Sequence, residues 1–195
     1  MESVMGAAQP GAKLSIDEFL AWDATQTDKV ELVCGEIFAM AGAEDGHVTV
    51  ALNIAIALRH HLKGSPCRAD MSDMKLRVDS LGSVFYPDVM VTCSAADHQS
   101  RLVKTEPILL VEVLSPSTAA YDRGNKFAQY RQLGSLREYV LVDVESRRTD
   151  VYRKNVDGLW VLHPFEPGQA VQLASVDLLL PDADLYAEVD PPEVA

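Results

Sequence analysis

The sequence predicts an α/β domain of three layers, in which helices flank a central mixed sheet and a C-terminal β meander follows. Two segments, Asp88–Cys93 and Ile108–Leu114, are apolar at nearly every position, as strands buried on both faces must be. The helical segment Asp122–Leu133 is followed by a third apolar strand, Arg137–Asp143, and this order is typical of a crossover connection. These observations favour a sheet that helices cover on both sides.

The N-terminal region is predicted to form a helix, a hairpin and a long helix. Ser15 and Glu18 have the spacing of a capping box, which predicts a helix that runs to about Ala24. In KVELVCGEIFAMAG, apolar and polar residues alternate around Cys34-Gly35, which indicates a hairpin with a positive φ at the glycine. Apolar residues then recur at helical spacing from about Asp45 to Leu62.

Shorter strands complete the predicted sheet. Cys67–Asp70 and Met74–Val78 have β-type composition and precede the central pair. After Asp143 the pieces TDVYRK, LWVLHP and AVQLAS alternate in character, which predicts an antiparallel meander.

Length and composition favour a single domain. The 195 residues, of which 48 % are hydrophobic, fit one domain over residues 1–195, with flexible ends at 1–13 and 189–195. The first residues lack a basic segment followed by an apolar core, and no apolar run reaches the length of a membrane span. We therefore expect a cytoplasmic protein with no membrane association.

The three cysteines indicate the same compartment. Cys34, Cys67 and Cys93 are odd in number and form no CxxC, so we expect neither a disulfide framework nor a zinc knuckle. This pattern is typical of a reducing environment.

The formal net charge of −12 bears on possible partners. Affinity for a phosphate backbone comes largely from Lys and Arg, so strong non-specific binding of nucleic acid is not expected. Acidity also has a general cause in solubility, and carboxylates gathered around a cation would add to it.

Two carboxylates lie in the most hydrophobic segments. Asp88 follows Pro87 at the start of one predicted strand, and Glu112 lies near the end of the next. If the two strands pair antiparallel, the carboxylates meet at one end of the sheet. Carboxylates held together in a half-buried setting either share a proton or bind a cation, and a hard divalent ion is the simplest occupant.

Each carboxylate also has a structural interpretation. An aspartate after a proline often only opens a turn. Glu112 is bracketed by Val111 and Val113 and further apolar residues, and glutamate is rarely buried there without a partner. The pair is therefore more informative than either residue alone.

Several motifs in this order resemble the Uma family of endonucleases, within the PD-(D/E)XK restriction-endonuclease-like superfamily. They are ELVCGEIFAM, His47 at a helix start, YPDVMV, LLVEVLSPST, DRGNKFAQY and REYVLVD, and they span about Leu14 to Lys154. The resemblance implies a restriction-endonuclease-like three-layer α/β/α fold and a metal-dependent phosphodiesterase. It implies Asp88 and Glu112 as the acids that hold Mg²⁺ or Mn²⁺, with a catalytic lysine nearby.

The chain departs from the superfamily pattern at the lysine. The usual motif has lysine two residues after the glutamate, and this position is Leu114. Lys126, on the following helix, is the candidate replacement, in the position where the family has a lysine. Asp122, Lys126 and Tyr130 are spaced by four residues, so they share a helix face that could point toward the strand ends. The alternative is a solvated helix with an Asp-Lys pair.

Three further residues are candidates for accessory roles. Glu36 lies in the segment where related folds have another acid, and it is a candidate catalytic residue, although an ordinary hairpin carboxylate is equally consistent. His47 could bind a metal or transfer a proton, or it could be a helix cap. Tyr130 is a possible accessory residue through its helix face.

Two classes of function therefore remain open. The first is a metal-dependent endonuclease or phosphodiesterase, which acts on nucleic acid or on a small phosphoester. The second is a non-catalytic binding or assembly module with a nuclease fold, which the acidity and Leu114 favour. Cleavage of both strands of a duplex needs two sites, so a homodimer is expected for the endonuclease.

Overall fold

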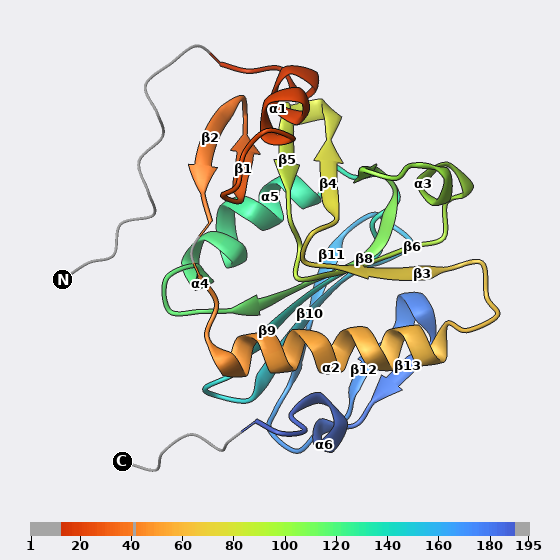
Figure 1. Ribbon diagram of the computed structural model, residues 1–195. Helices are drawn as coiled ribbons and strands as arrows, with labels where there is room; N and C mark the ends of the chain where they lie inside the picture. Colours follow the sequence, from red (N-terminus) through yellow and green to blue (C-terminus); the bar gives the residue numbers. More distant parts are fainter. Residues whose placement is uncertain (1–12, 41, 190–195) are drawn as a thin grey trace.

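Helices surround a central sheet and a second, N-terminal sheet in the computed structural model, which describes residues 13–40 and 42–189 (Figure 1). The α-helices are α1 (Ile16–Asp23), α2 (Asp45–His61), α3 (Ala95–Gln99), α4 (Ala119–Tyr121), α5 (Phe127–Tyr130) and α6 (Asp182–Leu185). Short 3₁₀ turns are η1 (Asp79–Leu81) and η3 (Ala174–Val176), and η2 (Asp122–Lys126) is a π-helical turn.

The strands form two large sheets and a ribbon. The central sheet has the order β11-β10-β9-β8-β6-β3, the N-terminal sheet has the order β2-β1-β5-β4-β7, and β12 pairs with β13. Their bounds are β1 (Val30–Val33), β2 (Glu36–Ala39), β3 (Arg68–Met71), β4 (Lys75–Val78), β5 (Ser83–Phe85), β6 (Val89–Thr92), β7 (Val103–Lys104), β8 (Pro107–Leu114), β9 (Glu138–Asp143), β10 (Arg148–Lys154), β11 (Trp160–Phe165), β12 (Val171–Leu173) and β13 (Leu178–Leu180).

The central sheet is mixed, as the sequence predicts. β6 and β8 pair antiparallel, with Val89 opposite Val111, so Asp88 and Glu112 lie at the same end of the two strands. β8 and β9 pair parallel, and the segment α4-η2-α5 makes the crossover between them. The antiparallel pairing on which the candidate site depends is confirmed.

The strand β8 has an apolar core on each face. Leu109, Val111 and Val113 pack in one core with the inner side of α2. Leu110 and Leu114 alternate with them and pack in a second core with residues of α5. This alternation explains the continuous apolar run, because both faces of the strand are covered by helices.

The local predictions for the N-terminal elements are confirmed. Ser15 caps α1 in a capping box, in which Ser15 Oγ accepts a hydrogen bond from the backbone N–H of Glu18 and Glu18 Oε2 accepts one from the backbone N–H of Ser15. Cys34 and Gly35 both have positive φ, at 52° and 86°, which is the geometry of a type I′ hairpin turn. Its two strands, β1 and β2, pair over their whole length.

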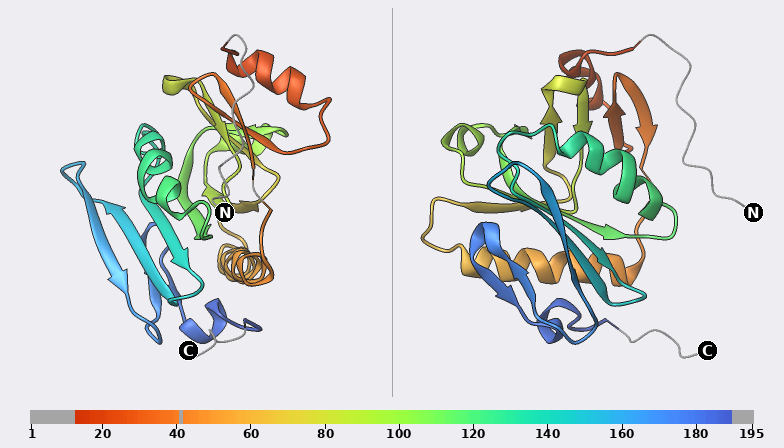
Figure 2. Two further views of the ribbon diagram at one scale, coloured as in Figure 1. Left: turned by 90° about the vertical axis from the view of Figure 1, so that its left-hand side faces the viewer. Right: turned by 180° about the vertical axis from the view of Figure 1, so that it is seen from behind.

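The N-terminal hairpin does not join the central sheet. β1 pairs with β5, a strand that the sequence pattern did not reveal, and α1 packs against this second sheet. Figure 2 shows α1 and the N-terminal sheet at one end of the molecule, with α2, α6 and the β12-β13 ribbon at the other. The prediction of a single central sheet is correct for β3, β6 and β8–β11 but wrong for the hairpin and for β4, which belong to the second sheet. The predicted meander is correct for β10 and β11 but wrong for β12, which pairs with β13.

The predicted helix at Asp122–Leu133 lies three residues earlier in the chain and is less regular than expected. Helical structure begins at Ala119, passes through the π-helical turn η2 and ends as α5 at Tyr130. π-helical turns are rare and frequently occur at functional sites.

The cysteine prediction needs a correction. Cys67 and Cys93 form a disulfide, while Cys34 is free and exposed. Arg68 lies opposite Thr92 in the antiparallel pair β3-β6, so the two cysteines are the next cross-strand neighbours. Sequence spacing alone did not indicate this pair because their proximity depends on strand pairing.

Residues 1–12 and 190–195, which include most of the two ends predicted to be flexible, lie outside the described residues. Within residues 13–40 and 42–189, no helix has the length and apolar character that a bilayer crossing requires.

Candidate active site

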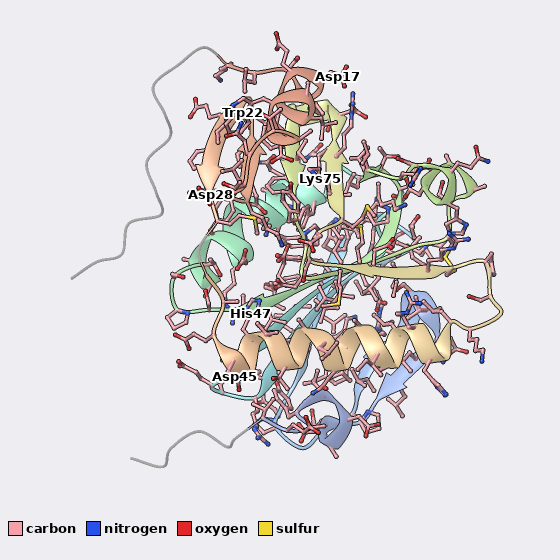
Figure 3. The ribbon with its side chains drawn as sticks, in the orientation of Figure 1. Asp17, Trp22, Asp28, Asp45, His47 and Lys75 are labelled. Carbon is pink, nitrogen blue, oxygen red and sulfur yellow. A yellow bond between two sulfur atoms is a disulfide. The ribbon has the colours of Figure 1, made fainter. Side chains whose placement is uncertain are left out.

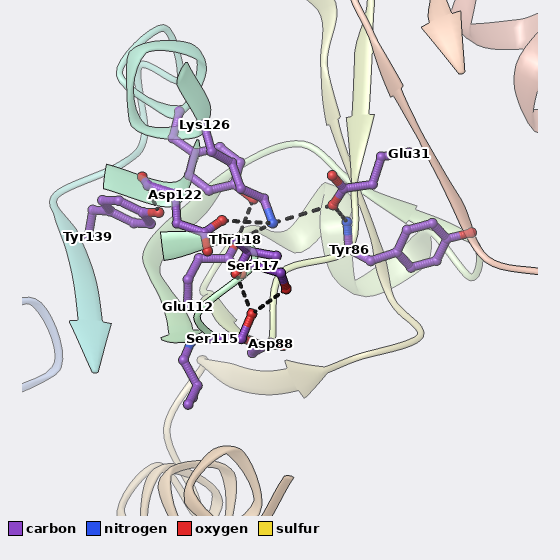
Figure 4. Close-up of polar contacts among 12 residues, drawn as sticks. Glu31, Tyr86, Asp88, Glu112, Ser115, Ser117, Thr118, Asp122, Lys126 and Tyr139 are labelled. Carbon is purple, nitrogen blue, oxygen red and sulfur yellow. Dashed lines mark hydrogen bonds and ion pairs between the residues drawn. The ribbon is translucent and has the colours of Figure 1, made fainter. Parts of the chain in front are cut away.

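A cavity of about 490 Å³ opens at the end of the central sheet where Asp88 and Glu112 meet. Its walls come from the hairpin β1-β2, the start of α2, the loop after β8 and the turn η2. Segments that are distant in the sequence therefore share one recess. Figure 4 shows several of its polar residues, among them Glu31, Asp88, Glu112 and Lys126.

Asp88 is fixed from two sides. One carboxylate oxygen, Oδ2, accepts a hydrogen bond of 2.7 Å from the backbone N–H of Val113. The other, Oδ1, lies 3.1 Å from His47 Nε2, which belongs to the first turn of α2. The residue thus does more than open a turn, because its side chain joins β6, β8 and α2.

Glu112 lies on the face of β8 that α5 covers and is only 3 % exposed. Its Oε1 accepts a hydrogen bond of 2.7 Å from the Tyr130 hydroxyl and lies 3.0 Å from Lys126 Nζ. The carboxylate therefore has the partners that a buried charge needs.

Lys126 points from the turn η2 toward the same face of β8. Its Nζ is 3.0 Å from Glu112, 3.4 Å from Glu31 Oε1 and 3.8 Å from Asp122 Oδ1 (Figure 4). Leu114, where the superfamily has its lysine, is buried in the adjacent core. The ammonium of Lys126 thus reaches Glu112 from a helix instead of from the strand, as the sequence predicts.

The recess contains more carboxylates than ammonium groups. Burial raises the pKa of Glu112 well above its ordinary value, Lys126 opposes this rise, and the charges of Asp88 and Asp122 add to it. Burial alone would lower the pKa of Lys126, but the carboxylates of Glu112, Glu31 and Asp122 raise it well above its ordinary value. Burial is thus the main cause of the raised pKa of Glu112, whereas the surrounding carboxylates raise the pKa of Lys126.

Glu36 does not reach the recess. It is exposed on β2 next to the hairpin turn and is absent from the cavity walls, while Glu31 of β1 is buried and lines them. The backbone N–H of Tyr86 donates to Glu31 Oε1 at 3.2 Å. The acid that the hairpin contributes is therefore Glu31, which sequence reasoning had not selected as a site residue.

His47 and Tyr130 each contact a carboxylate of the recess, Asp88 and Glu112 respectively. His47 lines the cavity, and its other ring nitrogen, Nδ1, is buried with no hydrogen-bond partner among the described residues. Burial would lower the pKa of His47, but the hydrogen bond and charge of Asp88, with the charge of Asp122, raise it. Tyr130 is fully buried and donates a hydrogen bond to Glu112.

Three hydroxyl groups after β8 also line the cavity. Ser115 Oγ lies 3.1 Å from Ser117 Oγ and 3.0 Å from Thr118 Oγ1, within the motif SPST. The sequence reasoning gave these residues no role, although a run of hydroxyls directly after a strand that carries a buried glutamate was visible.

The carboxylate oxygens of the recess are the type of ligand that a hard divalent ion prefers. Carboxylate oxygens of Asp88, Glu112 and Glu31 line one cavity and carry surplus negative charge. Within the described part of the chain, however, no three His, Cys, Asp or Glu side chains converge as a preformed cluster. Mg²⁺ commonly binds through one or two carboxylates and keeps several waters, so two acids are enough.

The fold and the site define the class. An acid at the start of one central strand, a second acid inside its antiparallel neighbour and a lysine beside them are the arrangement of a restriction-endonuclease-like protein. The model of the Uma2 family, described as "Putative restriction endonuclease", matches residues 16–186. The chain therefore belongs to the Uma2 family, which confirms the resemblance.

Known relatives and a solved structure agree with this assignment. Two uncharacterized proteins of Synechocystis sp. (strain ATCC 27184 / PCC 6803 / Kazusa) are 38 % identical over 169 residues and 35 % identical over 151 residues. These matches cover 87 % and 76 % of this chain, and 89 % and 85 % of the relatives. A crystal structure of a protein from Anabaena variabilis, described as a putative nuclease belonging to DUF820, matches with a TM-score of 0.70 at 18 % identity, over 89 % of this chain and 97 % of that one. This last likeness concerns the fold.

Proposed function

We propose that the protein is a divalent-metal-dependent endonuclease that hydrolyses phosphodiester bonds of nucleic acid in the recess around Asp88, Glu112 and Lys126. One observation carries the proposal: Lys126 Nζ lies 3.0 Å from Glu112 on the strand face where the superfamily lysine would project. The acids and the ammonium that this chemistry needs are thus brought together despite Leu114.

Asp88 and Glu112 would hold the ion, Mg²⁺ or Mn²⁺, with water and substrate phosphate completing its shell. When bound, a divalent ion neutralises charge on the scissile phosphate and lowers the pKa of bound water. The two hydrogen bonds to Asp88 fix the direction of its carboxylate before any ligand arrives. Such preorganisation lowers the cost of assembling the site.

Lys126 would act as an electrostatic group and not as a base. The surrounding carboxylates raise its pKa, so the nitrogen keeps its proton and has no free electron pair at neutral pH. A charged ammonium can donate a hydrogen bond to a phosphate oxygen and stabilise the negative charge that develops there. Glu31 and Asp122 are its other carboxylate neighbours, at 3.4 Å and 3.8 Å.

The alternative, a non-catalytic module, has three observations in its favour. Lys126 already neutralises Glu112 internally, and the chain has a net charge of −12, which opposes approach of a phosphate backbone. Arginines that could meet nucleic acid are partly engaged, as Arg123 pairs with Asp150 and Arg148 with Glu166.

A cleavage assay on single-stranded and duplex DNA and RNA with Mg²⁺ or Mn²⁺ tests the proposal. Wild-type protein should cleave only with metal, and Asp88→Asn and Glu112→Gln should abolish cleavage. Glu31→Gln should reduce it, whereas Glu36→Gln, on the same hairpin but exposed, should not. Absence of metal-dependent cleavage on every substrate, with a folded protein, would favour the non-catalytic module.

A further inference from the structure

The outer face of α2 carries an unusual apolar stripe. Val48, Leu52 and Ile56 are 51 %, 45 % and 57 % exposed, and they are spaced by four residues, so they lie in one row. The opposite face of α2 is buried against the central sheet. Single exposed apolar residues are ordinary, but a continuous row on one helix indicates a contact surface.

Opposite charges bound this row. Glu44 and Asp45 are exposed at the first turn of α2, and Arg59 and His60 are exposed at its last turn. Asp45 lies three residues before Val48, and Arg59 three residues after Ile56, so both continue the same row. Asp45 and the start of α2 are seen in Figure 3. Neither Asp45 nor Arg59 has an ion-pair partner within the described residues.

We infer that this face binds the same face of a second copy of the chain, with the two α2 helices antiparallel around a twofold axis at Leu52. In that register Leu52 meets Leu52 of the partner subunit, and Val48 meets the partner's Ile56. Asp45 then lies opposite the partner's Arg59, twice in each dimer. When two copies of the row lie antiparallel, each acid thus faces a base and each apolar residue faces another apolar residue.

This self-complementarity selects a second copy as the occupant. A twofold interface needs one patch that is complementary to itself. The row consists of an acid, three apolar residues and a base, so it is complementary to itself when it is rotated about its central residue. The antiparallel arrangement also places the positive end of each helix dipole beside the negative end of the other. An unrelated partner would not need the acid and the base at equal distances from Leu52.

The proposed interface adjoins the cavity. Val48 lines the cavity, and His47, which contacts Asp88, is its neighbour on α2. Pairing through α2 would bring the rims of two cavities near one another. The inference stands on the α2 face alone and does not depend on the proposed endonuclease activity.

Sedimentation velocity of the full chain over a range of concentrations tests the inference. Wild-type protein should form a dimer, and Leu52→Asp should weaken it by at least about 10-fold in dissociation constant, since it places two carboxylates on the axis. Leu102→Asp, at a 74 % exposed leucine outside α2, is the control and should leave the dimer unchanged. Circular dichroism checks that each variant is folded.

A charge exchange and a cross-link make the test specific to the register. Asp45→Lys and Arg59→Glu should each weaken the dimer, and the double variant should restore it. In a Cys34→Ser background, Leu52→Cys should form an intersubunit disulfide on mild oxidation, and Leu102→Cys should not. A monomeric wild type, or a dimer that survives Leu52→Asp, would overturn the inference, as would a double variant no better than the singles.

Discussion

Lys126 Nζ lies 3.0 Å from Glu112 Oε1 inside the protein, and both side chains are almost fully buried, at 6 % and 3 % exposure. Removal of one partner from a buried pair leaves an uncompensated charge, which typically costs more than the pair contributes. The contact is therefore decisive for stability as well as for the proposed chemistry.

Lys126→Met is expected to destabilise the protein by about 3–5 kcal/mol at pH 8, because Glu112, Glu31 and Asp122 lose the ammonium that they share. The loss should be smaller at pH 5, because the raised pKa of Glu112 favours its protonation as the pH falls. Urea unfolding at the two pH values measures this. Lys104→Met is the matched control, since Lys104 is also buried but bonds to the carbonyl oxygens of Asp97 and Ser100, and its effect should not depend on pH.

Glu112→Gln should separate stability from metal binding. The pKa of Glu112 is raised by burial, so its ionisation costs the folded wild type increasing stability as the pH rises above its unfolded value. The neutral glutamine avoids this loss, so the melting temperature of the variant minus that of the wild type should be larger at pH 8 than at pH 5. Its stabilisation by Mg²⁺ should disappear. A melting temperature that still rises with Mg²⁺ would argue against Glu112 as a ligand.

His47→Gln should cost more stability at low pH than at high pH. Burial would lower the pKa of His47, but Asp88 outweighs it, so the pKa in the folded protein is raised. The interaction therefore stabilises the protein fully below the unfolded pKa of about 6.5. This stabilisation is lost as the pH rises through the folded pKa. Thermal unfolding at pH 5.5 and pH 9 compares the two regimes. His60→Gln, on the exposed end of the same helix, should show no such trend if the effect arises from Asp88.

Reduction of the Cys67–Cys93 disulfide should lower stability without changing the site. The bridge closes a segment with a sequence separation of 26, for which the chain-entropy model gives about 3.5 kcal/mol. Cys67→Ser with Cys93→Ser should therefore unfold at lower urea concentration. Its response to Mg²⁺ should match that of the wild type, because the bridge lies at the end of β6 opposite to Asp88. A lost metal response would mean that the bridge also shapes the recess.

Local patterns predicted most of the central sheet. Three features depend only on residues close in sequence, so they can be recognised in a single sequence. They are the runs of β6, β8 and β9 that are apolar on both faces, the capping box at Ser15 and the Cys34-Gly35 turn. The approach of Asp88 to Glu112 followed from one further assumption, that consecutive strands pair antiparallel.

Features that depend on distant contacts were missed. β5 is only three residues long and is defined by its partners β1 and β4, so it has no clear period of its own. The choice between Glu31 and Glu36 depends on which positions along the hairpin face the recess, because both strands line it. Glu36 adjoins the turn and is solvated, whereas Glu31 is held by the N–H of Tyr86, a residue 55 positions away. Local composition contains none of this information.

The depth of the recess leads to a prediction about substrate. Lys126 and Glu112 lie at its buried end, and its walls include Phe38 and Tyr86. A stiff duplex carries its phosphates on its outer surface and bends only at a cost, whereas a single strand can enter and stack its bases on aromatic side chains. We expect cleavage of a single-stranded oligonucleotide to be at least about 10-fold faster than cleavage of the same sequence in a duplex.

Ala39→Trp makes this prediction specific to the recess. Ala39 is exposed on β2 and lines the cavity, so a tryptophan there should narrow the entrance while leaving the core intact. Cleavage of the single strand should fall on the order of 10-fold, with stabilisation by Mg²⁺ unchanged because the ion is small. Val156→Trp, at a fully exposed position in the β10-β11 turn, controls for the added aromatic ring and should cleave like the wild type. Equal rates on single strand and duplex, both insensitive to Ala39→Trp, would show that the phosphodiester does not enter this recess, and the catalytic role of Lys126 would fall with it.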